Sequence, residues 1–228
     1  MTGDDLDQAL RDHDAAGLPG GPVVAVVGTA GTTNAGLVDD LAGISRVASA
    51  RQMWFHVDAA YGGAALLAPT ARPLFTGISA ADSITMDPHK WWFAPFDVAA
   101  IIYREPALAK TVHTQQASYL DVLHDHDEWN PTDYAYHLTR RARGLPLWFS
   151  LAVHGTAAYR EAVDASLQLT REVATYIQEH PLLELVDDLA HVLADEFVAF
   201  LARGLDDDAV ALLVDRVQNV GDAFAHAL

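Results

Sequence analysis

Polar side chains follow three apolar runs of the chain, at the points where buried strands would end. In chain order, they are Thr32-Thr33 after Val23 to Val27, Asp58 after Met53 to Val57, and His89-Lys90 after Ser83 to Met86. In an open α/β sheet the carboxyl ends of parallel strands share one edge, and ligands bind at that edge. We therefore expect hydroxyl groups, a carboxylate, an imidazole and an amine to meet at one edge of a sheet.

An amine and a carboxylate at the same edge suit pyridoxal 5′-phosphate (PLP). This cofactor needs an amine that holds its aldehyde as a Schiff base and a carboxylate beside its pyridine nitrogen. Lys90 could supply the amine, and the aromatic residues Trp91 to Phe93 would partly desolvate it, which helps an amine act as a nucleophile. Asp58 could supply the carboxylate, because a pyridinium would compensate a negative charge that lies between apolar neighbours.

Each of these residues also has a purely structural interpretation. Lys90 could be a surface lysine, Asp58 could cap a helix or pair with an arginine, and His89 could either pack or move protons near the imine. The loop Gly28 to Thr33 lacks the Gly-Lys-Ser/Thr ending of a phosphate loop, which argues against a nucleoside triphosphate site. The run His124 to Glu128 has no helical or strand spacing, so we interpret it as solvated charge and expect no metal.

The composition of the 228 residues limits the classes of function. A formal net charge of −17 disfavours binding to nucleic acid or to an acidic membrane surface. The absence of cysteine excludes disulfides and thiolate chemistry, and 51% apolar residues indicate a packed globular protein. The start is polar and acidic, and no apolar run approaches the roughly 18 residues of a membrane span. We expect a cytoplasmic protein.

The predicted elements have the order of an α/β fold. The predicted strands are Val23 to Val27 and Met53 to Val57, both buried, then Ser83 to Met86, and finally Asp97 to Tyr103, which could return antiparallel. The predicted helices are Asp39 to Ala50, Arg140 to Tyr159 and Val163 to Glu179. The first helix lies between two strands, and a strand–helix–strand unit makes those strands parallel.

Together these segments resemble the group II PLP-dependent amino-acid decarboxylases, which include the aromatic-amino-acid, glutamate and diaminobutyrate decarboxylases. The matching segments are Gly31 to Asn34, His56 to Gly63, Asp87 to Trp91, Ser118 to Leu120 and Arg140 to Leu145. Their order and spacing carry the resemblance, which covers about residues 5–186. It implies an α/β fold with a mainly parallel sheet and flanking helices, part of the large domain of the fold-type-I PLP transferases.

The resemblance implies a role for each of several residues. Lys90 would hold the cofactor as a Schiff base, and Asp58 would pair with the pyridine nitrogen. Ala60 would pack on one face of the ring, and Thr33 would contact the cofactor near the ring substituents. His89 would neighbour both the lysine and the phosphate.

Four further positions are interpreted through the same resemblance. Tyr119 would protonate the substrate carbon after carbon dioxide leaves. Asp87 stands where the family often has Asn near the phosphate, so its charge departs from the family pattern. The arginine run Arg140 to Arg143 is a family hallmark to which we assign a structural role, and Pro146, which replaces a common lysine, could disturb the helix there.

The implied function is the decarboxylation of an L-amino acid by a PLP-dependent carboxy-lyase, with a small-molecule substrate and a homodimeric assembly. The family's chains are considerably longer, so residues 1–186 are expected to be a partial large domain and residues 187–228 an acidic helical tail. The alternative is a catalytically incompetent fragment that binds PLP weakly or acts only with a complementing chain. An aminotransferase fits less well, because His89 directly precedes Lys90 and Tyr119 stands at the decarboxylase spacing.

Overall fold

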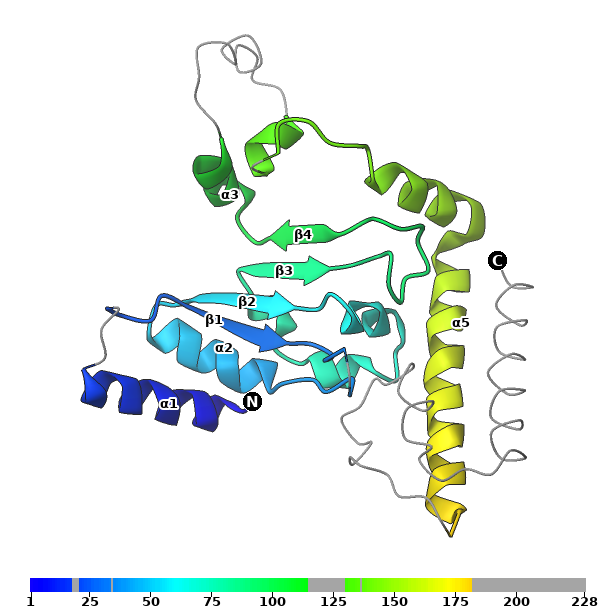
Figure 1. The fold of residues 1–228 in the computed structure, drawn as a ribbon, viewed down its shortest axis with the longest axis horizontal. Helices are drawn as coiled ribbons and strands as arrows, with labels where there is room; N and C mark the ends of the chain where they lie inside the picture. Colours follow the sequence, from blue (N-terminus) through cyan, green and yellow to red (C-terminus); the bar gives the residue numbers. More distant parts are fainter. Residues whose placement is uncertain (18–20, 34, 115–129, 136, 182–228) are drawn as a thin grey trace.

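The computed structural model describes residues 1–17, 21–33, 35–114, 130–135 and 137–181 of the chain (Figure 1). Its α-helices are α1 (Gly3–Ala16), α2 (Leu41–Ala50), α3 (Pro106–His113) and α5 (Gly144–Glu179). Its strands are β1 (Ala25–Thr29), β2 (Trp54–Asp58), β3 (Ser83–Met86) and β4 (Ala100–Tyr103). Short 3-10 helices are η1 (Gly62–Leu67), η2 (Arg72–Phe75), η3 (Ile78–Ala80) and η5 (Pro131–Tyr134).

The four strands form one sheet in the order β1-β2-β3-β4. The first three strands are parallel, and β4 returns antiparallel to β3. The α/β fold with a mainly parallel sheet is therefore confirmed, as is the antiparallel return of the fourth strand. Thr29, Asp58 and Thr85 are paired across neighbouring strands, so the strand ends that carry the polar residues lie side by side.

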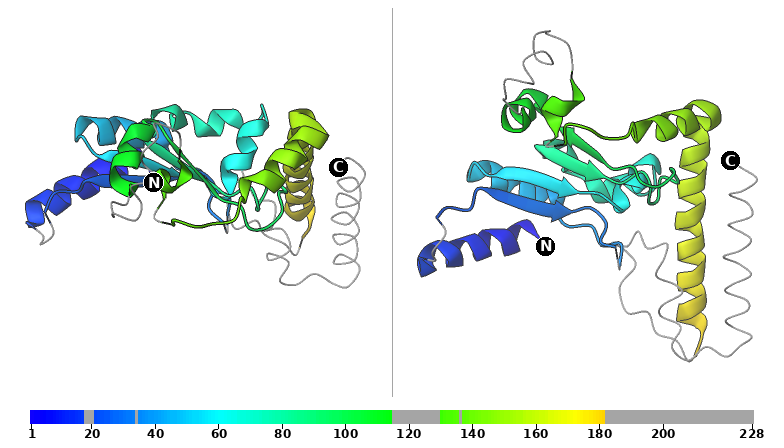
Figure 2. Two further views of the ribbon diagram at one scale, coloured as in Figure 1. Left: turned by 90° about the horizontal axis from the view of Figure 1, so that it is seen from above. Right: turned by 45° about the horizontal axis from the view of Figure 1, so that its top comes forward.

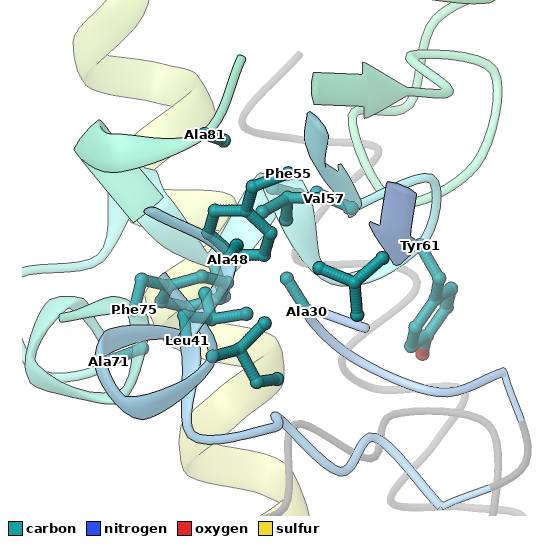
Figure 3. Packing of buried hydrophobic residues seen from close by; sticks show 14 of the residues in the cluster. Ala30, Leu41, Ala48, Phe55, Val57, Tyr61, Ala71, Phe75 and Ala81 are labelled. Atoms are coloured by element: carbon teal, nitrogen blue, oxygen red, sulfur yellow. The ribbon is translucent and has the colours of Figure 1, made fainter. Parts of the chain in front are cut away.

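The main core lies between one face of the sheet and the segments that cover it. Ile44 of α2 and Val57 of β2 are completely buried, and Phe55 and Phe75 are almost so. Figure 3 shows Phe55 and Val57 packed with residues from α2 and η2. Burial of such side chains supplies most of the stabilisation of this layer, at about 25 cal/mol for each Å² of apolar surface removed from water.

The prediction that β1 and β2 are buried on both faces is wrong for the described part of the chain. Along β1 the residues alternate between buried and exposed, and Val27 is 53% exposed. Along β2 the completely buried Val57 is followed by the exposed Asp58. Successive side chains of a strand point to opposite faces, and the described segments cover one of those faces.

The helix α5 contains a break at Gly155, whose backbone has φ 74° and ψ 162°. Two helical segments were predicted, but with a boundary between Tyr159 and Val163, both of which lie inside the second segment. Arg140 to Arg143 precede the helix, and Pro146 lies in its first turn, where backbone N–H groups lack helical partners and proline is tolerated. Proline therefore does not disturb the helix.

After the break, α5 runs beside the carboxyl ends of β1, β2 and β3 (Figures 1 and 2). Its residues Val163 and Leu167 belong to the main hydrophobic core. This helix therefore closes the core at the same end of the sheet where the candidate residues lie. None of the helices in the described part of the chain combines the length and apolarity needed to cross a membrane.

Several sequence-based predictions concern residues outside the described ranges. They are the role of Tyr119, the interpretation of residues 124–128 as solvated charge, and the acidic tail over residues 187–228. Each stays a prediction.

Candidate cofactor site

Backbone hydrogen bonds join the three segments that follow β1, β2 and β3. The Ala30 N–H donates to the Asp58 carbonyl at 2.7 Å, and the Asp87 N–H donates to the Ala60 carbonyl at 3.1 Å. The segment after β2 is thus held between the segments after its two neighbours. The segments that carry the candidate residues therefore adjoin one another at one edge of the sheet, as the order of the strands predicts.

Lys90 lies in a tight turn that immediately follows this edge. Its N–H donates to the Asp87 carbonyl at 2.9 Å, and the Ala94 N–H donates to the Pro88 carbonyl at 3.0 Å. The Lys90 Nζ forms an ion pair with Asp87 Oδ2 at 2.9 Å. The side chain of Lys90 is 36% exposed and that of Asp87 is 16% exposed, so the amine is reachable while its partner is largely enclosed.

Trp91 fixes the turn to the core. Its indole is 5% exposed, stacks on Tyr61 at a centroid distance of 5.7 Å, and donates from Nε1 to Ser166 Oγ on α5 at 2.8 Å. Trp91 therefore points into the core and leaves the Lys90 side chain partly exposed, a weaker desolvation than the aromatic run suggested. Trp91 instead helps to position the amine, because its ring is held by Tyr61, which precedes η1, and by Ser166 of α5.

Asp58 is exposed at the end of β2, and its Oδ1 accepts a hydrogen bond from the Ala60 N–H at 3.0 Å. This contact caps the turn that follows β2, and is neither the helix cap nor the arginine pair considered for Asp58. An ionised carboxylate has about four acceptor positions, so the cap leaves capacity for a cationic donor. A protonated ring nitrogen is a donor of that kind.

The ring of His89 is oriented by the segment before β4. His89 Nδ1 lies 2.5 Å from the Val98 carbonyl oxygen, and the Phe96 ring meets it edge-on with centroids 5.0 Å apart. A carbonyl oxygen can only accept, so Nδ1 carries the proton. In the neutral ring Nε2 is then an acceptor, able to take up a proton.

The segment that orients His89 is itself held by the arginine run. Asp97 Oδ1 contacts Arg141 Nη2 at 2.6 Å and Arg143 Nε at 3.2 Å. Burial acts to raise the pKa of the Asp97 carboxyl, but the hydrogen bond from Arg143 and the two guanidinium charges lower it overall. Two arginines of the run, Arg141 and Arg143, thus have a structural contact, which holds Asp97 next to Val98.

His56 belongs to a polar cluster on the sheet face that also carries Asp58. Its Nδ1 lies 2.8 Å from Ser83 Oγ and its Nε2 lies 3.2 Å from Thr85 Oγ1, while Trp54 Nε1 donates to Ser83 Oγ at 2.9 Å. Burial lowers the pKa of His56, and the charge of Asp58 partly opposes that shift. Sequence reasoning missed His56, although its spacing of two residues from Asp58 on a strand was a signal that both face the same side.

Thr33 and Ala60 complete the described set. Thr33 is exposed in the loop after β1, which is folded back by hydrogen bonds from the Gly31 and Thr32 N–H groups to the Leu37 carbonyl. Ala60 is half-buried beside Asp58. The structure therefore places Ala60 at the shared edge and Thr33 in the loop that leaves β1.

The chemistry of these donors fits PLP in three respects and conflicts with it in one. Lys90 offers an exposed amine, Asp58 has free acceptor capacity, and His89 presents Nε2 as a base. The conflict is Asp87, an anionic side chain at a position where the resemblance implies a nearby phosphate. The donor chemistry therefore suits the aldehyde and the ring of the cofactor, whereas Asp87 would place an unfavourable charge near the phosphate.

Comparison with known proteins gives matches along most of the chain. Residues 1–200 match the pyridoxal-dependent decarboxylase conserved domain. The L-2,4-diaminobutyrate decarboxylase of Acinetobacter baumannii is 34% identical over 225 residues, which are 97% of this chain and 42% of that protein. The aromatic-L-amino-acid decarboxylase of Bacillus atrophaeus is 34% identical over 154 residues, 67% of this chain and 32% of that protein.

Solved structures give the same result. The structure of Oryza sativa TDC with PLP and tryptamine matches with a TM-score of 0.75 at 27% identity, over 82% of this chain and 38% of that one. The match thus spans less than half the length of each of these three relatives. Pyridoxal phosphate, the cofactor predicted from the sequence, is the cofactor of the matched family. The chain belongs to the pyridoxal-dependent decarboxylase family.

Proposed function

We propose that this chain carries the lysine-bearing part of a PLP-dependent amino-acid decarboxylase, a carboxy-lyase. One observation supports this assignment above the others. The hydrogen bond from the Asp87 N–H to the Ala60 carbonyl joins the Asp58 segment to the Lys90 turn at the same sheet edge. A carboxylate and an amine on adjoining segments are what one pyridine ring needs at its two ends.

Lys90 and Asp58 have complementary tasks in this proposal. The Lys90 amine would bind the aldehyde, and the Asp58 carboxylate would keep the ring nitrogen protonated. When bound, the cofactor supplies an electron-accepting ring that stabilises the electron pair left on the substrate when carbon dioxide departs. The chain's contribution is to orient both ends, because a fixed geometry removes much of the entropic cost of the reaction.

The remaining candidates would bind or move protons. His89, with its Nδ1 proton held by Val98, would present Nε2 toward the amine and exchange a proton with it. Ala60 would pack against the ring, and Thr33 would contact its substituents. Tyr119 would deliver a proton to the substrate carbon.

Reduction and peptide mapping test the proposal directly. The purified chain is incubated with PLP, reduced with borohydride and digested, and the modified peptides are identified by mass spectrometry. The chain has two lysines, Lys90 and Lys110, so Lys110 is an internal control for non-specific labelling. We expect the label on Lys90 in preference to Lys110, and we expect the Lys90→Ala variant to lose it. Equal labelling of both lysines would contradict the assignment.

A second candidate function is a decarboxylase fragment that acts only with a complementing chain. It is favoured by the exposed apolar residues on the first segment of α5, among them Trp148 (59% exposed) and Val153 (74% exposed), and by Val27 on the open sheet face. Large contiguous apolar surfaces commonly mark contacts with other chains. Release of carbon dioxide from L-amino acids only after a second chain is added would select this alternative.

Assembly and location belong to the same proposal. The exposed apolar surface is compatible with a homodimer as well as with a complementing chain, and a cytoplasmic location follows from the expectation made on the sequence. Sedimentation of the purified chain alone separates a homodimer from a monomer that awaits a partner.

A further inference from the structure

The ion pair between Lys90 and Asp87 joins a more exposed amine to a more enclosed carboxylate. Asp87 is held through its N–H by the Ala60 carbonyl and through its own carbonyl by the Lys90 N–H. Its side chain is 16% exposed, whereas that of Lys90 is 36% exposed. The Asp87 carboxylate is therefore the more enclosed partner, and the Lys90 amine is the partner with access to solvent when the pair opens.

We propose that Asp87 restrains the Lys90 amine and competes with the aldehyde ligand for it, so that Asp87 is a positioning residue that sets how readily this site captures its cofactor. The restraint of the amine depends only on the observed contact. The effect of Asp87 on cofactor binding by Lys90 rests on the function proposed above.

The chemistry of capture explains the competition. To bind an aldehyde, the ammonium must leave Asp87 and give up a proton to solvent. The nitrogen lone pair then attacks the carbonyl carbon, a carbon–nitrogen bond forms and water departs. Each event requires the ion pair to be open, so a carboxylate in contact with the amine slows the first step.

Charge acts in the same direction on the cofactor. PLP carries an anionic phosphate, and Asp87 adds a negative charge at the edge where the amine must meet the aldehyde. Like charges in a partly enclosed site repel more strongly than in bulk water. Pyridoxal, which lacks the phosphate, should experience only the competition for the amine.

Competitive labelling of the cofactor-free full chain tests the restraint. The chain is treated with trace acetic anhydride, and the acetylation rates of Lys90 and Lys110 are compared by mass spectrometry. Lys110 forms its own ion pair with Asp133 at 3.2 Å and so provides an internal reference. In Asp87→Asn we expect the rate at Lys90 to rise about two- to fivefold, the range for a partly exposed ion pair, with Lys110 unchanged.

The control variant is Asp58→Asn, which removes a charge at the same edge but leaves the Lys90–Asp87 contact. In this variant the acetylation rate of Lys90 should stay close to that in the wild type. An equal rate in wild type and Asp87→Asn, or an equal increase in Asp58→Asn, would overturn the proposal. Thermal unfolding of each variant confirms that the fold is retained.

Spectroscopic titration with PLP and with pyridoxal tests the effect on capture. Asp87→Asn should bind both more tightly than the wild type, with the larger gain for PLP. Unchanged affinities would refute the role in capture. Should neither wild type nor variant form an adduct at Lys90, the proposed function fails, and the restraint is still decided by the acetylation rates.

Discussion

Trp91 and Ser166 are 75 residues apart in the chain and are joined by a buried hydrogen bond of 2.8 Å from the indole Nε1 to the serine Oγ. The bond connects the turn that carries Lys90 to the helix α5, which runs past the ends of the parallel strands. Ser166 also donates to the Val163 carbonyl at 3.0 Å, so its hydroxyl is satisfied from both sides. The position of the amine therefore depends on a helix that follows it far along the chain.

Removing the serine hydroxyl should destabilise the protein. In Ser166→Ala the buried indole N–H loses its acceptor, and we expect the free energy of unfolding to fall by about 1–3 kcal/mol. Urea denaturation measures this change. A double-mutant cycle with Trp91→Phe, which removes the donor, isolates the bond: Ser166→Ala should cost less in the Trp91→Phe background. The same cost in both backgrounds would show that this hydrogen bond does not contribute.

The contact between Asp97 and the arginine run should be visible in its titration. In Arg143→Ala the pKa of Asp97 should rise toward its ordinary value of 3.8, because a hydrogen bond and a positive charge are lost. The Val98 segment should also loosen, and the His89 amide, which donates to the Val98 carbonyl, should exchange its proton faster. Carboxyl-carbon NMR and hydrogen exchange measure the two effects.

Arg140→Ala is the matched control for that experiment. Arg140 belongs to the same run but donates to the Pro131 carbonyl at 2.8 Å, away from Asp97. The Arg140→Ala variant should therefore leave the pKa of Asp97 unchanged. A shift of Asp97 in Arg140→Ala as large as in Arg143→Ala would mean that general charge, and not the contact, sets the pKa.

The fold class and the edge of the sheet could be predicted because they depend on local patterns. The strand Ser83–Met86 was predicted with its observed bounds, since its run ends at Asp87. The first two strands were predicted to end too early, before Thr29 and Asp58. Hydrophobicity indicates burial, whereas a strand is defined by backbone pairing, and the last paired residues of β1 and β2 are the polar Thr29 and Asp58.

The long-range contacts that position the candidate site residues could not be predicted in the same way. The contact of Asp97 with Arg141 joins residues 44 positions apart, and that of His56 with Ser83 depends on the register of two strands. For the arginine run, the resemblance implied only a structural role. Which carboxylate the arginines meet is decided by packing, and no local pattern carries that information.

The close approach of η1 to the loop after β1 makes Gly62 sensitive to substitution. A Cβ at this position would overlap the Ala30 carbonyl oxygen and lie 2.8 Å from the Gly31 Cα. Both neighbours are backbone and cannot rotate away, so Gly62→Ala should lower the free energy of unfolding by about 1–3 kcal/mol or more. Gly144→Ala is the control, because a Cβ there meets nothing within 4 Å. Similar losses in both variants would contradict the packing at Gly62.

The last prediction concerns the pH dependence introduced by His56. Burial lowers its pKa in the folded protein below the ordinary value of 6.5, so on acidification the unfolded chain takes up this proton first. The contribution of His56 to stability is then fully present above the unfolded value and is lost as the pH falls through 6.5 toward the folded pKa. Urea denaturation between about pH 8 and pH 5 should show a smaller loss of stability for His56→Gln than for the wild type.

Titration of the His56 ring by NMR tests the cause. The negative charge of Asp58 raises the pKa of His56 against the effect of burial, so Asp58→Asn should lower that pKa further. Asp87→Asn removes a charge that is already engaged with Lys90 and should leave His56 unchanged. An increase in the pKa of His56 in Asp58→Asn would contradict the arrangement of the two side chains on one face of β2. A decrease of the same size in both variants would show that His56 senses the total charge of the edge and not Asp58 in particular.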